Sequence, residues 1–284
     1  MDISQFPIWR AAAAAALALA PAAALADSPP PPPLPSAVLT YADLADLSDS
    51  ARLVVRAKPR KVIQVEPERA RGLRPGWGRF YVEAKTEAVI AGSEPLGPDL
   101  RYLVDLPLDA KGKPVAFKKK SVVLFARTVP GRPGELQLVV PDGQFLWDPL
   151  LDSRLRGVLN ALYAPAAPQK VTGVREAIHV SGDLAGEGET QLFLGTANGE
   201  PAAVTVARKP GQAPRWSVSF SEVVAGDAAP PARDTLAWYR LACFLPAQLP
   251  AAANISPAAA DRTAAVRDYR FVMEQLGPCP RSRR

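Results

Sequence analysis

The sequence predicts an α+β protein. An N-terminal antiparallel β barrel or sheet, for which an OB-type barrel is one possible topology, is followed by an antiparallel sheet with C-terminal helices. Three observations lead to this fold class. Apolar and polar residues alternate with a period of two in much of residues 53–140 and 174–220. Helical spacing of apolar residues is clearest after residue 148 and near the end of the chain. The 31 prolines favour strands, turns and extended linkers over long helices.

Residues 1–26 have the composition of a cleavable secretory signal peptide. Arg10 precedes an unbroken run of Ala and Leu, and residues 24–26 have the small-x-small pattern that a signal peptidase recognises. Cleavage is therefore expected between Ala26 and Asp27. A retained membrane anchor is the alternative, but the apolar run is shorter than the roughly 20 residues of a spanning helix. We expect a periplasmic or secreted protein that is not an integral membrane protein after cleavage.

The remaining chain divides into three predicted parts. Residues 27–36 include a run of five prolines and are expected to form an extended linker. Residues 37–145 are predicted to form a β-rich domain, and residues 146–284 an α+β domain.

Five candidate strands account for most of the first domain, after a short helix expected at Tyr41–Leu47. In Phe80–Ile90 apolar side chains alternate with polar ones, as in a half-buried antiparallel strand. Val122–Ala126 is apolar on both faces, which places it in the middle of a sheet or barrel. The other candidates are Leu53–Lys58, Tyr102–Leu106 and Leu136–Val140. Five strands joined by polar loops suit an OB-type barrel, and a plain antiparallel sheet or sandwich would give the same pattern.

The second domain begins with a predicted helix. Asp148 is its expected N-cap, and Pro149 suits its first position. Four strands are then expected, and Asn198-Gly199 between the second and third is a strong hairpin turn. The expected strands are Val174–Val180, Thr190–Thr196, Ala202–Ala207 and Trp216–Phe220.

Two helices are predicted to end the chain. The first, Thr235–Leu245, is apolar on nearly all sides and is expected to be buried. The second is expected to begin with Ser256 as its N-cap and to end at Gly277. Arg281–Arg284 is expected to be a frayed tail.

The chain has two cysteines, Cys243 and Cys279. An exported protein with two cysteines near helix ends is expected to join them in a structural disulfide. A redox pair is the alternative, but redox dithiols usually lie close together in sequence. Two thiols and one histidine do not complete a common zinc site, so neither a metal nor another cofactor is expected.

Two segments contain candidate residues for a polar site. His179 is the only histidine, and it lies in a predicted strand where a packed or surface imidazole is the simpler interpretation. Residues 182–189 combine glycines with Asp183, Glu187 and Glu189, which suit a cation site or a general acid. A turn between two strands explains the same glycines.

Lysines gather before the apolar strand at Val122. Lys118, Lys119 and Lys120 are consecutive, and Lys111 and Lys113 precede them in the same loop. On an OB-type barrel such a loop is a candidate for binding an anion or a single-stranded nucleic acid. Export disfavours nucleic acid, so an anionic component of the cell envelope is the more specific hypothesis. Lysines that protect an apolar strand from aggregation are the alternative.

Three stretches resemble a group of exported proteins of alphaproteobacteria that have no assigned activity. They are Gly186–Leu194, Pro210–Ser219 and Thr235–Pro246. The resemblance extends in order over most of residues 37–280 and implies an exported protein. It carries no catalytic residues over to this chain.

The sequence therefore predicts a non-catalytic periplasmic binding protein or envelope-associated protein, because it combines an export signal with β-rich domains and no recognisable catalytic set. Its partner is expected to be a cell-envelope component such as an anionic glycan, a lipid or a protein. The alternative is a periplasmic hydrolase that uses carboxylates, with Glu187 or Glu189 as candidates.

Overall fold

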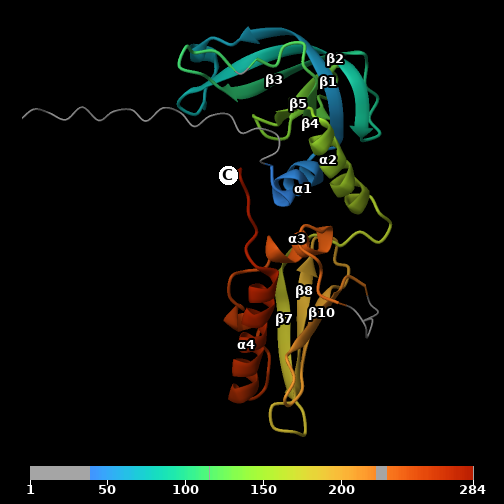
Figure 1. The fold of residues 1–284 in the computed structure, drawn as a ribbon, viewed down its shortest axis with the longest axis vertical. Helices are drawn as coiled ribbons and strands as arrows, with labels where there is room; N and C mark the ends of the chain where they lie inside the picture. Colours follow the sequence, from blue (N-terminus) through green and yellow to red (C-terminus); the bar gives the residue numbers. More distant parts are fainter. Residues whose placement is uncertain (1–38, 115, 222–228, 284) are drawn as a thin grey trace, which may run out of the picture. The chain divides into compact units, whose positions relative to one another are not determined.

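The structure is a computed structural model that describes residues 39–114, 116–221 and 229–283 (Figure 1). The predicted signal peptide, its cleavage point between Ala26 and Asp27, and the proline-rich segment 27–36 lie outside the described residues. The fold class is confirmed: a closed five-stranded barrel precedes a four-stranded antiparallel sheet and C-terminal helices.

The barrel is formed by β1 to β5. These are β1 (Leu53–Gln64), β2 (Trp77–Ala91), β3 (Asp99–Pro107), β4 (Val122–Thr128) and β5 (Glu135–Leu138). The strands follow the order β1-β2-β3-β5-β4, and β4 pairs with β1 to close the barrel. Among the described strands of the barrel, β3 and β5 alone pair in parallel. A short strand that the sequence did not predict, β6 (Gln144–Leu146), adds to β4.

Alternating side chains fill the barrel because successive residues of a strand face opposite sides. In β4 Val122, Leu124 and Ala126 point into the barrel, while Val123 and Phe125 belong to a second core outside it. All five are fully buried, which confirms the prediction that this strand is covered on both faces.

The second core contains two helices that flank the barrel in sequence, α1 (Tyr41–Ser50) and α2 (Pro149–Leu162). Asp148 caps α2 as predicted, because its Oδ1 accepts a hydrogen bond from the Leu151 N–H at 2.8 Å. The buried side chains of α2, among them Leu151, Leu155 and Val158, follow helical spacing. Thr40 caps α1 in a reciprocal arrangement with Asp43.

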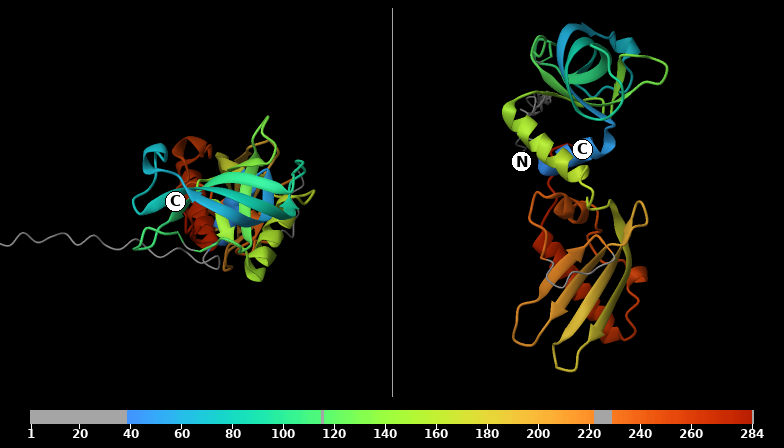
Figure 2. Two further views of the ribbon diagram at one scale, coloured as in Figure 1. Left: turned by 90° about the horizontal axis from the view of Figure 1, so that it is seen from above. Right: turned by 90° about the vertical axis from the view of Figure 1, so that its right-hand side faces the viewer.

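The four-stranded sheet has the order β10-β9-β8-β7, with antiparallel neighbours. Its strands are β7 (Val171–Ser181), β8 (Gly188–Thr196), β9 (Ala203–Arg208) and β10 (Arg215–Ser219). The helix α4 (Ala259–Leu276) lies along this sheet (Figure 2), with Ala265, Tyr269 and Val272 buried in the second core. The short helix α3 (Leu236–Ala242) precedes it. In the residues that the structure describes, the other helical elements are the single 3-10 turns η2 (Pro67–Arg69) and η3 (Ala251–Ala253).

The ends of the last two helices differ from the predictions. The helix expected at Thr235–Leu245 ends at Ala242, with Cys243 as its C-cap. The last helix begins at Ala259 rather than after Ser256, because the buried Ser256 Oγ accepts a hydrogen bond from the His179 backbone N–H at 3.0 Å. A tertiary contact thus uses the hydroxyl that local spacing had assigned to the cap.

In the described part of the chain, no helix is long and apolar enough to cross a membrane.

Candidate functional site

Five exposed cations from two segments of the barrel lie side by side. Lys58 and Arg60 flank Pro59 on β1, and the Lys119 N–H donates a hydrogen bond to the Pro59 carbonyl at 2.9 Å. This bond places the loop before β4 against β1. We call the resulting surface, made by Lys58, Arg60, Lys118, Lys119 and Lys120, the basic surface.

The fold holds this loop in place from inside the barrel. Phe117 is 5% exposed and belongs to the barrel core, so it anchors the start of the lysine run. The Lys120 N–H then bonds to the Phe117 carbonyl at 3.0 Å, and Lys119 adopts a left-handed backbone conformation with φ of 66°. The turn leaves all three lysine side chains in solvent.

The cations of the basic surface differ from their neighbours in having no acidic partner. Within the described residues, none of the five forms an ion pair. Nearby Lys61 pairs with Glu83 at 3.4 Å, and Lys85 pairs with Asp99 at 2.6 Å. The positive charge of the basic surface is therefore free to act on an external anion.

Lys111 and Lys113 do not share this arrangement. Their backbone N–H groups both donate to Asp109 Oδ1 at 2.9 Å, which folds them into a separate turn. The lysine-rich loop therefore divides into two parts, and β1 supplies Lys58 and Arg60 in place of this pair.

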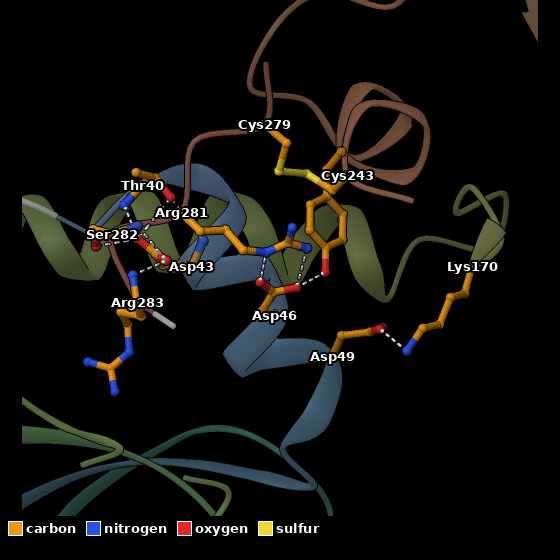
Figure 3. Close-up of polar contacts among 11 residues, drawn as sticks. Thr40, Asp43, Asp46, Asp49, Lys170, Cys243, Cys279, Arg281, Ser282 and Arg283 are labelled. Carbon is orange, nitrogen blue, oxygen red and sulfur yellow. Dashed lines mark hydrogen bonds and ion pairs between the residues drawn. A yellow bond between two sulfur atoms is a disulfide. The ribbon is translucent and has the colours of Figure 1, made fainter. Parts of the chain in front are cut away.

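A second site surrounds the acidic residues of α1 (Figure 3). Asp43, Asp46 and Asp49 are spaced three residues apart, so they lie along one side of the helix. Asp43 and Asp46 bind residues of the C-terminal segment, which we define as residues 280–283. Asp49 binds the Arg240 guanidinium through two hydrogen bonds of 3.0 and 3.1 Å.

The C-terminal segment is therefore ordered through residue 283, in contrast to the predicted frayed tail. Arg281 Nε donates to Asp46 Oδ2 at 2.6 Å, and Ser282 Oγ donates to Asp43 Oδ2 at 2.6 Å. The backbone N–H groups of Ser282 and Arg283 also donate to Asp43 Oδ1, at 3.1 and 3.3 Å. Charge complementarity between the basic tail and α1 is the physical reason for the difference.

A cleft of about 400 Å³ lies beside this segment. Its wall combines the apolar Leu47 and residues 139–141 with the carboxylates of Asp43, Asp46, Asp105 and Asp142. Arg283 borders the cleft and binds Asp142 Oδ1 at 2.5 Å, while Arg74 binds Asp142 Oδ2 at 2.8 Å. The Arg74 guanidinium also lies over the Trp77 ring, 3.6 Å from its centroid.

These contacts favour the ionised carboxylates. Burial by itself raises the pKa of Asp43, but hydrogen bonds from Ser282 and Thr40 outweigh it and leave that pKa below its usual value. For Asp49, burial is likewise outweighed by the hydrogen bonds and charge of Arg240, and its pKa is lowered. Burial, reinforced by Asp46, raises the pKa of the Tyr239 hydroxyl, which donates to Asp46 Oδ1 at 2.6 Å.

His179 belongs to a buried polar network between the sheet and α4. Its Nδ1 lies 2.7 Å from Thr190 Oγ1, which donates to Asp268 Oδ2 at 2.5 Å. Because that hydroxyl proton points to Asp268, the proton between the imidazole and Thr190 resides on Nδ1. Arg208 pairs with the other oxygen of Asp268, which is fully buried. The network joins α4 to β7, β8 and β9, and no described cleft opens onto it.

Asp183 and Glu187 lie on the hairpin turn between β7 and β8, and Glu189 is the second residue of β8. Asp183 and Glu189 are exposed, and Glu187 is half-buried, with its backbone N–H bonded to the Leu184 carbonyl at 2.9 Å. Glu189 accepts a hydrogen bond from Gln191 at 2.8 Å. None of these carboxylates lines the cleft. Within the described residues, no group of three or more metal-ligating side chains comes together.

The predicted disulfide between Cys243 and Cys279 is present, with Cα atoms 5.2 Å apart. It joins the C-cap of α3 to the residue immediately before the C-terminal segment. The bond therefore fixes the point from which that segment leaves α4 and extends toward α1 (Figure 3).

The acidic side of α1 was missing from the sequence-based candidates. The signal is present in the Asp-x-x-Asp-x-x-Asp spacing of Asp43, Asp46 and Asp49, and in the basic run at the other end of the chain. Each pattern alone is typical of a solvated surface, and only the fold shows that they bind each other.

No protein-family model matches the chain, and no curated protein is significantly similar to it in sequence. The geometry of the two sites is therefore the basis for the function proposed below.

Proposed function

We propose that this chain is an exported, non-catalytic binding protein that associates with the cell envelope through its basic surface. The observation that carries the proposal is the set of five exposed cations, from β1 and the loop before β4, that lack acidic partners within the described residues. Export is supported by the composition of residues 1–26 and by the disulfide, because disulfides persist mainly in oxidising compartments.

The chemistry of the basic surface suits the headgroups of anionic lipids. Four of its five cations are lysines, which act as flexible point charges rather than as rigid two-pronged donors. None of the five lines the cleft, and all five are exposed to solvent. A basic residue near an anionic membrane contributes about 1 kcal/mol of attraction, and several together give reversible binding.

The carboxylate hydrolase remains a prediction from sequence alone. Glu187 lies on a hairpin turn and Glu189 at the start of β8, both outside the cleft, and no observation on the described residues favours that activity.

Vesicle sedimentation of the purified protein tests the proposal. Vesicles of phosphatidylcholine with and without phosphatidylglycerol are used as the probe, at about 0.05 M and about 0.5 M salt. We expect binding only to vesicles that contain phosphatidylglycerol and only at low salt, because salt screens exposed charges. The triple variant Lys118→Glu, Lys119→Glu and Lys120→Glu should lose this binding.

A charge-matched variant controls for net charge. Lys209→Glu, Arg215→Glu and Arg270→Glu change three exposed cations that lie outside the barrel and have no ion pair within the described residues. This variant should bind like the wild type. Equal loss of binding in both variants would show that net charge alone is responsible, and binding to neither vesicle type at low salt would overturn the proposal. Addition of a soluble anionic glycan as competitor then distinguishes a lipid surface from a glycan as the preferred polyanion.

A separate experiment tests whether the protein is exported to the cell envelope. Protein recovered from the periplasmic fraction should begin at Asp27, whereas an intact N-terminus on cytosolic protein would contradict export.

A further inference from the structure

The acidic side of α1 already holds a peptide, and that peptide is part of the same chain. We infer that this side of α1, together with the adjoining cleft, is a recognition site for an extended, arginine-containing segment of another protein, which residues 281–283 occupy in cis. The inference is independent of the basic surface, which lies on other residues of the barrel.

The first observation is that consecutive residues of the C-terminal segment each bind a different carboxylate. Arg281 binds Asp46 and Ser282 binds Asp43 (Figure 3). Arg283 reaches Asp142, which lies in the turn between β5 and β6. Backbone N–H groups contribute as well, since those of Ser282 and Arg283 donate to Asp43. Backbone groups and side chains of the segment therefore both take part in binding, as in other proteins that recognise extended peptides.

The second observation is that the cleft continues beyond the bound segment. Besides Arg283, its lining includes Trp77, Asp105 and Ser50 and the apolar residues 139–141. A volume of about 400 Å³ lies in the range of ligand pockets, which are mostly apolar with a few placed polar groups. A segment that extends past the position of Arg283 would therefore make contacts that residues 281–283 do not make.

The third observation concerns how the C-terminal segment is held. It has no regular secondary structure, and polar contacts with α1 and Asp142 hold it. Asp43 is only 2% exposed, so displacement of Ser282 without a replacement would leave a buried carboxylate with few donors. Exchange for a similar segment restores those hydrogen bonds, which makes replacement more favourable than simple release.

Arginine is favoured over lysine at position 281. Both Nε and Nη2 of Arg281 donate to Asp46, at 2.6 and 3.2 Å. A guanidinium matches a carboxylate in this two-pronged manner, whereas an ammonium group does not. Arg281 also lies 5.9 Å from the centroid of the Phe244 ring.

Fluorescence anisotropy with a labelled peptide of residues 280–284, Pro-Arg-Ser-Arg-Arg, tests the inference. The purified full chain is compared with the variant Arg281→Ala plus Arg283→Ala, in which the segment in cis is weakened. In the wild type, a site that residues 281–283 occupy nine-tenths of the time has an apparent affinity for the added peptide that is about tenfold weaker. We therefore expect the variant to bind the peptide at least about tenfold more tightly. Addition of Asp46→Asn and Asp142→Asn to the variant should abolish binding.

Two controls give the test its specificity. The peptide Pro-Lys-Ser-Lys-Lys has the same charge and should bind more weakly, whereas equal binding would reduce the interaction to charge alone and overturn the inference. The second control is the variant Arg132→Ala, which removes a cation that contacts Glu135 elsewhere on the barrel. This variant should bind the peptide like the wild type.

A measurement on the wild-type protein avoids dependence on the variants. Excess peptide should increase hydrogen exchange at the backbone amides of Ser282 and Arg283, which now donate to Asp43. Unchanged exchange together with no gain of affinity in the arginine variant would overturn the inference. The arginine variant could instead form dimers while its monomer does not bind the peptide. In that case a second copy of this chain, rather than another protein, uses the site, and the inference is contradicted.

Discussion

The Arg281 guanidinium donates two hydrogen bonds to the Asp46 carboxylate, at 2.6 and 3.2 Å, although the two residues are 235 positions apart in the chain. Asp46 lies in α1, before the barrel begins, and Arg281 follows the last helix. The Tyr239 hydroxyl donates to the same carboxylate from α3. One acidic residue thus joins three segments, which makes the acidic side of α1 both a structural junction and the candidate peptide site.

The acidic side of α1 should make stability depend on pH. The pKa values of Asp43 and Asp49 are lowered in the folded protein, where hydrogen bonds and Arg240 outweigh burial. Their contribution is therefore fully present above the unfolded value of 3.8 and is lost as pH falls through the lower folded pKa. Urea unfolding at about pH 6 and about pH 3 should show a clear loss of stability at the lower pH.

Asp49→Asn provides the comparison for this dependence. The variant should already be less stable at about pH 6, because Arg240 is only 5% exposed and would lose its charged partner. Its further loss on acidification should be smaller than that of the wild type. An equal loss in both proteins would show that Asp49 does not contribute to the pH dependence.

The buried network of His179 is expected to be structural. Thr190→Val keeps the shape of the side chain but leaves His179 Nδ1 and Asp268 Oδ2 without the hydroxyl between them. Loss of that group should lower the free energy of unfolding by about 1–3 kcal/mol. Thr205→Val is a matched control on β9, where the side chain is half-buried, and it should change stability by no more than about 0.5 kcal/mol. Equal effects of the two substitutions in urea unfolding would contradict a role for the network.

Two glycines should respond in opposite ways to alanine. Gly157 lies in α2 and is exposed, and a Cβ added there would meet no atom within 4 Å. Gly157→Ala should therefore stabilise the folded protein by about 0.5–1 kcal/mol, because alanine has the higher helix propensity. At Gly188 a Cβ would lie 2.8 Å from the His179 ring, which is packed against Thr190. Gly188→Ala should therefore destabilise the protein. Thermal unfolding of both variants compares these effects, and a stabilising shift in Gly188→Ala would contradict the packing described around His179.

Local patterns were sufficient to predict most of the elements. Val122–Ala126 is apolar on both faces, and the structure covers both faces. Asp148 was predicted to be the N-cap of a helix because its carboxylate precedes a proline and a series of apolar residues at helical spacing. The structure confirms this cap, since the Leu151 N–H donates a hydrogen bond to Asp148. Asn198-Gly199 marked a hairpin, and Gly199 has the positive φ of 80° that such turns require.

Features that depend on distant contacts were not predictable in the same way. Closure of the barrel includes the parallel pairing of Arg101 with Glu135, and no local pattern indicates which strands become neighbours. Ser256 matched the pattern of a helix cap but binds His179, 77 residues away. The C-terminal segment matched a frayed tail because its partners, Asp43 and Asp46, lie at the other end of the chain.

The candidate sites show the same difference between local sequence patterns and contacts of distant residues. Lys118, Lys119 and Lys120 were recognisable as a basic run, but Lys58 and Arg60 join them only through the bond between Lys119 and Pro59. The cleft was not predictable at all, because its lining comes from α1, β2, β3, the turn after β5 and the C-terminal segment. Surfaces assembled from several segments leave no continuous motif in the sequence.

The disulfide should stabilise both the fold and the position of the C-terminal segment. Cys243 and Cys279 are 36 residues apart, and the loop-entropy relation gives at most about 4 kcal/mol for such a bond. Cys243→Ser plus Cys279→Ser should therefore lower the free energy of unfolding by about 2–4 kcal/mol in urea titrations. Because Cys279 directly precedes the segment, the variant should also show faster hydrogen exchange at the amides of Ser282 and Arg283. Reductant should destabilise the wild type but leave the double variant unchanged, and labelling of free thiols in the native, unreduced wild type would contradict the bond itself.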